Sequence, residues 1–508
     1  MGTAVQSIIS TGSSGTIVDI ECHLSNNLPN IVIVGSANKA VDESRERIRG
    51  AFATSRIMLP RKRVIINLAP ADVPKSDSGF DLAIAVAILL ADGQVTTSID
   101  RSSAFIGELG LDGGVRAVRG IIGKIITGRA AGITTFYIPA ANLAQAQLVP
   151  EVSLVAIESL SQLYGHLAGG LSLDIVRTGS GKYLPPSASS SGSEVQLSEI
   201  VGQSMAKRAL EIAAAGGHNL LFSGPPGTGK SMLAKALPSI LPPMNREEVL
   251  EVTHLHSLAG HDYDKIQVER PFRSPHHSSS HVAIVGGGTR LKPGEISLAH
   301  RGVLFFDELP EFSRTTLEAL RQPLEDRVIS LARALERTEY PASFTLVATA
   351  NPCPCGYKDT NGACSCSGYA IKRYAQRLSG PILDRIDLSC DVYEVEHDKL
   401  LTQSLSPKSD EAIRQRVLKA CRIQAKRYSS STKLNAHMTN ADIKQFASLD
   451  PEAEAILNSA ARQYQLSARA YMRAVRVART IADLEGSPTI DASHATEALA
   501  YRKKRLKK

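Results

Sequence analysis

The feature that most constrains the fold is a glycine-rich segment between an apolar run and a helical run. The apolar run is 220–222 and the helical pattern is 232–237, so the segment lies in a strand–loop–helix context. It matches G-x-x-x-x-G-K-S, whose glycines let backbone N–H groups converge on phosphates at a helix N-terminus. The segment consists of Gly224, Pro225, Pro226, Gly227, Thr228, Gly229, Lys230 and Ser231. We therefore expect an ATP site in which Lys230 contacts the β- and γ-phosphates and Ser231 binds Mg²⁺.

Two later apolar runs end in polar residues that suit phosphoryl transfer. Asp307 and Glu308 follow the run 303–306, and Asn351 follows the run 344–348. Because ligands lie at the carboxyl ends of parallel strands, we expect Asp307 to hold Mg²⁺ and Glu308 to deprotonate the attacking water. Asn351 would position this water or contact the γ-phosphate. Acidic pairs and asparagines are also ordinary residues at the end of a strand. Their order along the chain after the glycine-rich segment favours the ATP site.

Four of the seven cysteines form one tight cluster. Cys353 and Cys355 form one C-x-C arm, and Cys364 and Cys366 form another. Four thiolates on two short arms can close a tetrahedral Zn²⁺ site, although C-x-C is tighter than the usual C-x-x-C. Four reduced thiols in a loop are the alternative. An odd number of cysteines with one cluster opposes a disulfide framework and favours a reducing compartment.

Composition indicates a soluble protein with an uneven charge. Apolar residues make up 43% and charged residues 21% of the chain, as in ordinary globular proteins. The apolar run 80–91 is too short to span a bilayer, and the N-terminus lacks a basic signal region, so we expect no membrane contact and a cytoplasmic location. Residues 401–508 hold 20 Lys and Arg against 10 Asp and Glu. This excess indicates a polyanionic partner such as DNA, or only a solvated basic tail at 502–508.

Length and pattern changes divide the chain into regions. A chain of 508 residues is too long for one core. We expect an α/β or α+β domain at 1–170 and a flexible linker at 171–196, where Ser, Gly and Pro interrupt the periodicity. A parallel sheet with crossovers should occupy 197–395, and a helical domain 396–508. Expected strands in the first region are 30–34, 64–67, 105–106 and 135–138, and expected helices are 44–53 and 81–90.

Several short strings outside the glycine-rich segment are distinctive. They are IVGQ at 200–203, FRSPHH at 272–277, FDEL at 306–309, NPCPCG at 351–356, GPILDRID at 380–387 and SARA at 467–470. In these strings, the chain resembles AAA+ ATPases, and within them the magnesium-chelatase-like YifB/ComM family, over nearly its whole length. The resemblance implies an α/β fold with an AAA+ P-loop core, a parallel sheet and a helical lid, preceded by a Lon-protease-like α+β domain.

The same resemblance assigns roles to three residues. It implies that Asn351 is sensor 1, that Arg385 is an arginine finger supplied to the neighbouring subunit, and that Arg469 is sensor 2 on the lid. An arginine supplied in trans can raise turnover by about 10³–10⁵-fold. From the residues alone, Arg385 is also a partner for Asp384 or Asp387, and Arg469 shares its predicted helix with three other arginines.

Residues 1–170 resemble the Lon-protease-like domain of this family in the segments 73–82 and 107–110. Lon-type proteases use a Ser–Lys dyad. Ser78 and Lys124 lie near the dyad positions but out of register, so we expect a binding or scaffold domain. Two inserted segments, 254–301 and 328–344, are similar to the pore-lining inserts of ring ATPases, whose basic side chains contact a phosphate backbone.

Several functions compete for this pattern. The leading hypothesis is a hexameric ring that uses ATP to move on branched or single-stranded DNA, as in branch migration. A magnesium-chelatase subunit and a protein-remodelling ATPase are alternatives that the ATPase core cannot separate from it. An ATP-dependent protease is opposed by the missing dyad, and a non-hydrolysing nucleotide switch is opposed by Glu308.

Overall fold

The computed structural model describes residues 4–11, 14–35, 39–71, 78–97, 99–179, 195–260, 265–288, 291–333, 336–358, 364–377, 380–395 and 407–502. They fall into two compact units. Unit 1 comprises Met1–Pro186, Asn245–Val268 and Ser330–Tyr340, and unit 2 comprises Ser187–Met244, Glu269–Ile329 and Pro341–Lys508. Two segments that the sequence places in the ATPase region therefore group with the N-terminal residues.

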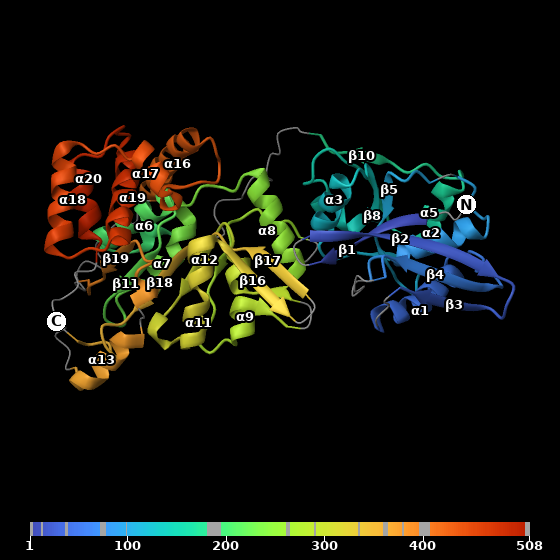
Figure 1. Ribbon diagram of the computed structural model, residues 1–508, viewed down its shortest axis with the longest axis horizontal. Helices are drawn as coiled ribbons and strands as arrows, with labels where there is room; N and C mark the ends of the chain where they lie inside the picture. Colours follow the sequence, from blue (N-terminus) through green and yellow to red (C-terminus); the bar gives the residue numbers. More distant parts are fainter. Residues whose placement is uncertain are drawn as a thin grey trace. The chain divides into compact units, whose positions relative to one another are not determined.

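Unit 1 is built on an eight-stranded mixed sheet (Figure 1). In spatial order its strands are β10 (Ile175–Arg177), β9 (Ser153–Ile157), β8 (Thr135–Pro139), β5 (Ser103–Phe105), β1 (Ala4–Thr11), β2 (Ser14–Ser25), β4 (Arg63–Ala69) and β3 (Asn30–Val34). The central β1 and β2 pair antiparallel along all of β1. Sequence patterns missed this hairpin because buried Ser7 interrupts the apolar alternation of β1. The predicted linker at 171–196 starts too early, because β10 pairs antiparallel with β9.

Helices and two small sheets complete unit 1. They are α1 (Lys39–Thr54), α2 (Asp81–Ala91), α3 (Ile121–Ala130), α4 (Leu143–Ala146), α5 (Leu160–Leu167), α8 (Arg246–Ala259), β6 (Glu108–Leu109) with β7 (Val115–Arg116), and most of β16 (Val328–Arg333) with β17 (Glu336–Pro341). Helix α2 is buried from Asp81 to Leu89, as its continuous apolar sequence requires. Burial raises the pKa of Asp81 to about 6, although Arg47 opposes this effect from 2.7 Å.

Unit 2 contains a five-stranded sheet in which every neighbouring pair is parallel. In spatial order its strands are β12 (Phe272–Arg273), β15 (Val303–Phe306), β18 (Thr345–Ala350), β11 (Leu220–Ser223) and β19 (Leu388–Asp391). All four residues of β15 are buried, as expected for a parallel strand covered on both faces. This sheet confirms the α/β fold expected for the core.

Helices flank this sheet and form the C-terminal part of unit 2 (Figure 1). They are α6 (Ser204–Gly216), α7 (Lys230–Ile240), α9 (His281–Val285), α10 (Glu295–Leu298), α11 (Arg314–Ala319), α12 (Arg321–Asp326), α13 (Gly368–Arg377), α14 (Gly380–Leu383), α16 (Pro407–Tyr428), α17 (Asn440–Phe446), α18 (Pro451–Gln463), α19 (Ala468–Glu485) and α20 (Ala492–Ala500), with a ribbon of β13 (Gly286–Gly287) and β14 (Lys292–Pro293). Among the described segments, no helix combines the length and the apolar character that crossing a membrane requires.

Candidate functional site

The glycine-rich segment joins the carboxyl end of β11 to the first turn of α7. Gly227 and Gly229 have φ values of 80° and 84°, in the left-handed region that glycine enters without steric cost. Gly229 is the N-cap residue of α7. The first backbone N–H groups of a helix have no partner within it, so this turn supplies donors for phosphate oxygens.

The Lys230 side chain lies over the loop that precedes it. Its Nζ donates to the carbonyl oxygens of Gly224 at 2.9 Å and Pro225 at 2.6 Å. Burial lowers the pKa of Lys230, and the nearby carboxylates of Asp307 and Glu308 oppose this change. The Lys230 ammonium group therefore lies close to the two carboxylates. A bound triphosphate would need a cation at the same place.

Asp307 is held by two hydroxyl groups at the carboxyl end of β15. Ser231 Oγ donates to its two carboxylate oxygens at 3.2 and 3.0 Å, and Thr349 Oγ1 donates to Oδ1 at 2.6 Å. A hydroxyl and a carboxylate side by side are oxygen ligands of the kind that Mg²⁺ prefers. The residues present thus fit a magnesium ion bound between Ser231 and Asp307.

Glu308 adopts a left-handed backbone conformation, with φ and ψ both 54°. This conformation is rare for a residue with a side chain and is concentrated at functional sites. The Glu308 N–H donates to Thr349 Oγ1 at 2.8 Å, and Asn351 Nδ2 lies 3.4 Å from Glu308 Oε1. Thr349 therefore orients both acidic residues, and Asn351 lies next to the carboxylate expected to deprotonate water.

The structure thus brings the glycine-rich segment, Asp307, Glu308 and Asn351 to one edge of the sheet. Thr349 was missed by the sequence reasoning, yet a signal for it exists. It lies two residues before Asn351, and strand alternation places residues with this spacing on the same side of a strand. Tyr374 of α13 was also missed. It is buried, and its hydroxyl receives a hydrogen bond from the Asn351 backbone.

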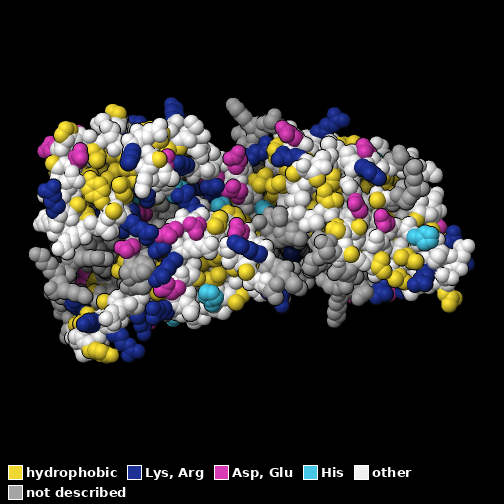
Figure 2. Space-filling view, in the orientation of Figure 1, with side chains coloured by type: hydrophobic (Ala, Val, Ile, Leu, Met, Phe, Trp, Pro, Cys, Tyr) yellow, Lys and Arg dark blue, Asp and Glu magenta, His cyan; other side chains and the backbone are white. Residues whose placement is uncertain are grey.

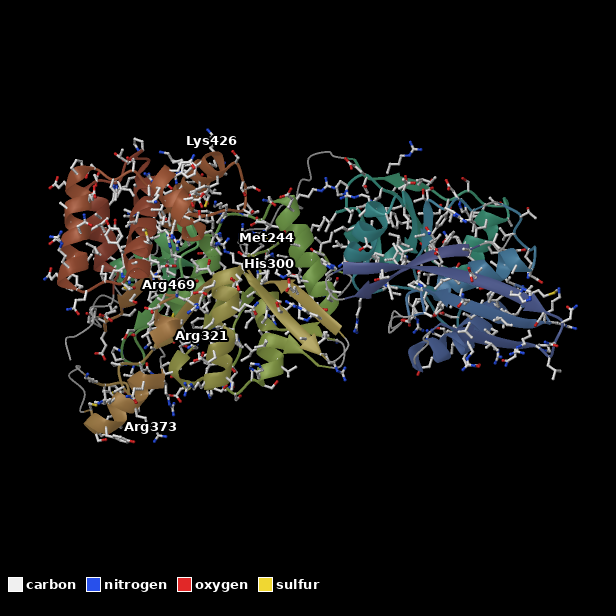
Figure 3. The ribbon with its side chains drawn as sticks, in the orientation of Figure 1. Met244, His300, Arg321, Arg373, Lys426 and Arg469 are labelled. Carbon is white, nitrogen blue, oxygen red and sulfur yellow. The ribbon has the colours of Figure 1, made fainter. Side chains whose placement is uncertain are left out.

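A pocket lies beside the same sheet, next to the amino ends of its strands. Asn219, which precedes β11, and Phe344, which precedes β18, are among its lining residues. Five arginines line this arginine pocket: Arg327, Arg385, Arg469, Arg473 and Arg476. In Figure 3, Arg469 lies where the C-terminal helices meet the core. The predicted finger and the predicted sensor 2 therefore lie together, at the sheet edge opposite Lys230.

Glu325 of α12 joins these two arginines. Its Oε1 lies 2.7 Å from Arg385 Nη2 and 3.6 Å from Arg469 Nη1. From the sequence, the acidic partner expected for Arg385 was Asp384 or Asp387. In the structure Arg385 pairs with Glu325 instead. Asp387 is engaged elsewhere, since it accepts the Asn219 N–H at 3.0 Å. The roles of Arg385 and Arg469 in catalysis stay predictions.

The four clustered cysteines converge on one point. Their sulfur atoms all lie within 4.8 Å of one another, so the cluster could hold a metal ion. Cys353 Sγ lies 3.4 Å from Cys355 Sγ and 3.7 Å from Cys364 Sγ. Four thiolates about 2.3 Å from a zinc ion would be separated by about 3.8 Å, which these distances approach. A hydrogen bond from the Tyr357 backbone, followed by one from Cys353, lowers the pKa of the Cys355 thiol to about 6.

The cysteine loop also touches the nucleotide loop. Gly356 has a φ of 87°, and a Cβ atom added to it would lie only 2.6 Å from Pro226 Cδ. Cys353 is buried three residues after β18 ends at Ala350. A metal ion at this cluster would therefore stiffen the loop that packs on Pro226, which is a structural role.

We expect purified protein to contain one zinc ion per chain, and the Cys353→Ser/Cys366→Ser double variant to lose it. Removing two of four thiolates leaves too few ligands for a closed zinc site. The double variant should also melt at a lower temperature, because metal binding contributes to folding. Elemental analysis and thermal melting measure both effects. Cys22→Ser, outside the cluster, is the matched control and should keep the metal. Metal-free protein purified without chelators would refute the assignment.

Unit 1 contains Ser78 and Lys124, the two residues near the expected dyad positions. The Ser78 hydroxyl donates to the Glu108 carboxylate, and Lys124 is buried within α3. In the insert expected from residue 254, His254 belongs to α8, and the rings of His276 and His277 lie 4.1 Å apart and are tilted by 34°.

Three family models match the chain, and together they cover most of it. They are described as "Magnesium chelatase, subunit ChlI" at residues 196–400, "Subunit ChlI of Mg-chelatase" at residues 20–142, and "Magnesium chelatase, subunit ChlI C-terminal" at residues 407–502. The first contains the nucleotide residues, the cysteine cluster and Arg385. The third contains Arg469.

Full-length relatives are more similar than chelatase subunits. The chain is 42% identical to the competence protein ComM of Haemophilus influenzae over 504 residues, covering 98% of this chain and 97% of the relative. It is 41% identical to the uncharacterized protein YifB of Salmonella typhimurium, covering 97% and 95%. A magnesium-chelatase 67 kDa subunit of Heliobacterium mobile is 25% identical over 41% of this chain and 34% of its own length. The chain therefore belongs to the YifB/ComM family of magnesium-chelatase-like AAA+ proteins.

Proposed function

We propose that the chain is a Mg²⁺-dependent ATPase that works as a ring-forming motor on branched or single-stranded DNA. The observation that carries the ATPase part is the convergence of Ser231, Asp307, Glu308 and Asn351 at the carboxyl edge of the parallel sheet. Bound Mg²⁺ would neutralise charge on the β- and γ-phosphates. Ser231 and Asp307 would hold it.

Each remaining residue of the site has a defined task in this proposal. Lys230 exchanges its bonds to loop carbonyls for bonds to phosphate oxygens. Glu308 accepts a proton from the attacking water, and Asn351 orients the Glu308 carboxylate and the water. Thr349 keeps Asp307 and Glu308 in place through one hydroxyl group. Preorganised groups of this kind stabilise charge that develops in the transition state.

The position of Arg385 supports a ring. It lies near the amino ends of the strands, whereas its own nucleotide loop lies at their carboxyl ends. An arginine on that edge can reach the phosphates of a second copy in a head-to-tail interface, and such interfaces form a ring when the rotation between copies closes. A hexamer is the ring size that we propose.

DNA as the partner is supported first by the name of the H. influenzae relative, a competence protein. Helix α13 adds a surface argument. Tyr369 is 77% exposed, and Lys372 and Arg373 are also exposed on this helix. Lys and Arg side chains gather over α13 in Figure 2, and Figure 3 labels Arg373 there. Basic side chains beside an aromatic ring suit a single strand, because they pair with phosphates while a base stacks on the ring.

The excess of Lys and Arg in residues 401–508 supports DNA binding less strongly than the residue count suggested. Arg479 is fully buried, Arg473 is 6% exposed, and Arg427 pairs with Asp483. These cations belong to the interior of unit 2. The basic tail after Arg502 lies outside the described residues. In the hairpin of β16 and β17, Arg337 pairs with Glu339 at 3.2 Å, which reduces the positive charge offered there.

The ATPase rate should rise when single-stranded DNA or a four-way junction is added, and less with plain duplex. A motor couples hydrolysis to the strand that it grips, so the preferred structure gives the larger stimulation. Phosphate release at saturating ATP measures this effect. A rate that no DNA changes, together with no DNA binding at low salt, would contradict the DNA motor. A chelatase-type or protein-remodelling ATPase would then be the better proposal.

The affinity for DNA should fall steeply with salt and depend on α13. Each phosphate contact contributes about −0.7 to −0.9 to the slope of log K against log salt. Lys372→Ala/Arg373→Ala should therefore weaken binding and reduce the steepness of the slope by roughly two. Fluorescence anisotropy between 50 and 200 mM salt, roughly the range in which such contacts weaken, measures it. The matched control is Arg422→Ala/Lys426→Ala, an exposed basic pair on α16. Equal slopes for both variants would remove α13 from the interface.

A further inference from the structure

The arginine pocket is lined by five arginines, and only Arg385 and Arg469 have predicted roles in ATP hydrolysis. Its volume is about 520 Å³, and its lining combines five arginines with three carboxylates. Two carboxylates are already engaged, since Glu325 contacts Arg385 and Arg469, and Asp387 accepts the Asn219 N–H. The third, Asp384, lies 3.9 Å from Arg473. His437 adds no cation, because burial and then Arg327 lower its pKa to about 3.

Arg473 is buried in this pocket, and its hydrogen bonding is incomplete within the described part of the chain. It is 6% exposed, and its Nε and Nη1 have no hydrogen-bond acceptor among the residues that the structure describes. The Nε of Arg476, which follows one helical turn later, is in the same situation. Buried polar atoms are nearly always hydrogen-bonded, and burying a donor without an acceptor is costly. Burial lowers the pKa of both arginines, against the attraction of Asp387.

The next arginine of α19 shows what a structural role would look like. Arg479 is fully buried, but its guanidinium donates to Asp483 at 2.9 Å, to the Pro488 carbonyl at 2.8 Å and to the Ser487 carbonyl. Its Nε also donates to Asp483, at 3.2 Å, so all of its nitrogen atoms are used within the fold. Arg473 lies on the same helix without such partners and lines a cavity instead. The contrast indicates that its donors serve a ligand.

We propose that Arg473, Arg476 and Arg327 bind a phosphate-type oxyanion in this pocket, separately from the glycine-rich loop of the same chain. Guanidinium groups form bidentate bonds to phosphate, and several together match an anion with more than one charge. The anion has two possible sources, which are free phosphate or polyphosphate, and a nucleotide held by a neighbouring copy. The second source alone rests on the proposed ring.

Tripolyphosphate is the probe for the site, used on the Lys230→Ala chain so that the nucleotide loop does not bind it. Thermal melting and calorimetry should show saturable binding, and Arg473→Met should weaken it by about 10- to 100-fold. Arg473→Lys should weaken it less, because the charge remains but the fork geometry is lost. The control is Arg462→Met, an exposed arginine on α18, which should leave binding unchanged.

The stability of the unliganded variants provides an independent readout. Without the anion, Arg473→Met should melt at the same or a higher temperature, because a buried cation with two unsatisfied donors is replaced by an apolar side chain. A strong loss of stability would instead mean that Arg473 holds the fold together, and would overturn the proposal. If that variant fails to fold, Arg476→Met is measured in the same way.

Protein concentration distinguishes the two sources. Binding by dilute, monomeric Lys230→Ala chain identifies free polyphosphate as a ligand. If monomers do not bind, the anion must come from a neighbour, and Arg473→Met should then weaken ATP-dependent assembly of Glu308→Gln chains. The proposal fails if neither occurs, or if sodium chloride at equal ionic strength reproduces the stabilisation. None of these measurements requires hydrolysis or DNA, so the DNA motor can fail while the anion site stands.

Discussion

Replacing Glu308 with glutamine should lower ATP turnover by about 10²–10⁴-fold and leave ATP binding nearly unchanged. The carboxylate is needed as a base only when water attacks, so its loss affects the transition state and not the ground state. Glutamine keeps the size of the side chain and an oxygen for the contact with Asn351. Lys230→Ala should instead lose binding, because Lys230 contacts the ground-state phosphates. Phosphate release and calorimetric titration with ATP separate the two effects.

Glu311→Gln is the matched control for this experiment. Glu311 lies three residues further along the chain and pairs with Arg377 at 2.8 Å, where a surface ion pair contributes little. Its variant should turn over ATP at the natural rate. Near-normal turnover by Glu308→Gln, with normal binding, would mean that another group activates water, and the interpretation of the acidic pair would be wrong.

The nucleotide residues could be predicted because each lies at a chemically distinctive junction of the chain. The segment from Gly224 to Ser231 has a spacing that only a phosphate loop requires, and Asp307 and Glu308 directly follow four buried residues. In a parallel sheet all carboxyl ends meet at one edge, so strand order alone brings these residues together. The cysteine cluster was predictable for a similar reason, since close spacing in sequence limits the distance in space.

Other features depend on which elements pack together, and sequence spacing does not contain that information. Glu325 lies 60 residues before Arg385, and no periodicity connects them, so only the packing of α12 reveals this partner. The unsatisfied donors of Arg473 likewise emerge only when the carboxylates around it are located. The sequence could not assign helix α8 to unit 1 either. This helix contacts α3, where His254 lies against Gly123, and these two residues are more than a hundred positions apart in the chain.

Replacing Arg385 with alanine should lower ATP turnover by about 10³–10⁵-fold. In a head-to-tail ring its guanidinium would face the γ-phosphate of the neighbour, where charge develops during transfer. Binding of ATP by the same chain should persist, because Arg385 lies at the opposite sheet edge from Lys230. Arg385→Lys should not restore the rate, since lysine lacks the planar fork. Arg321→Ala is the control, because Arg321 pairs within α11 and α12 with Glu318.

Mixing Arg385→Ala chains with Lys230→Ala chains tests whether Arg385 acts in trans. Neither chain should hydrolyse ATP alone. Where the two meet, an intact nucleotide loop can face an intact Arg385, and this arrangement occurs at roughly a quarter of the interfaces in a ring of randomly mixed chains. Partial activity that appears on mixing would place Arg385 in the neighbour's site. If mixing restores nothing, and if dilute monomeric Arg385→Ala chain hydrolyses ATP at the natural rate, Arg385 is no finger and its bond to Glu325 would be its main role.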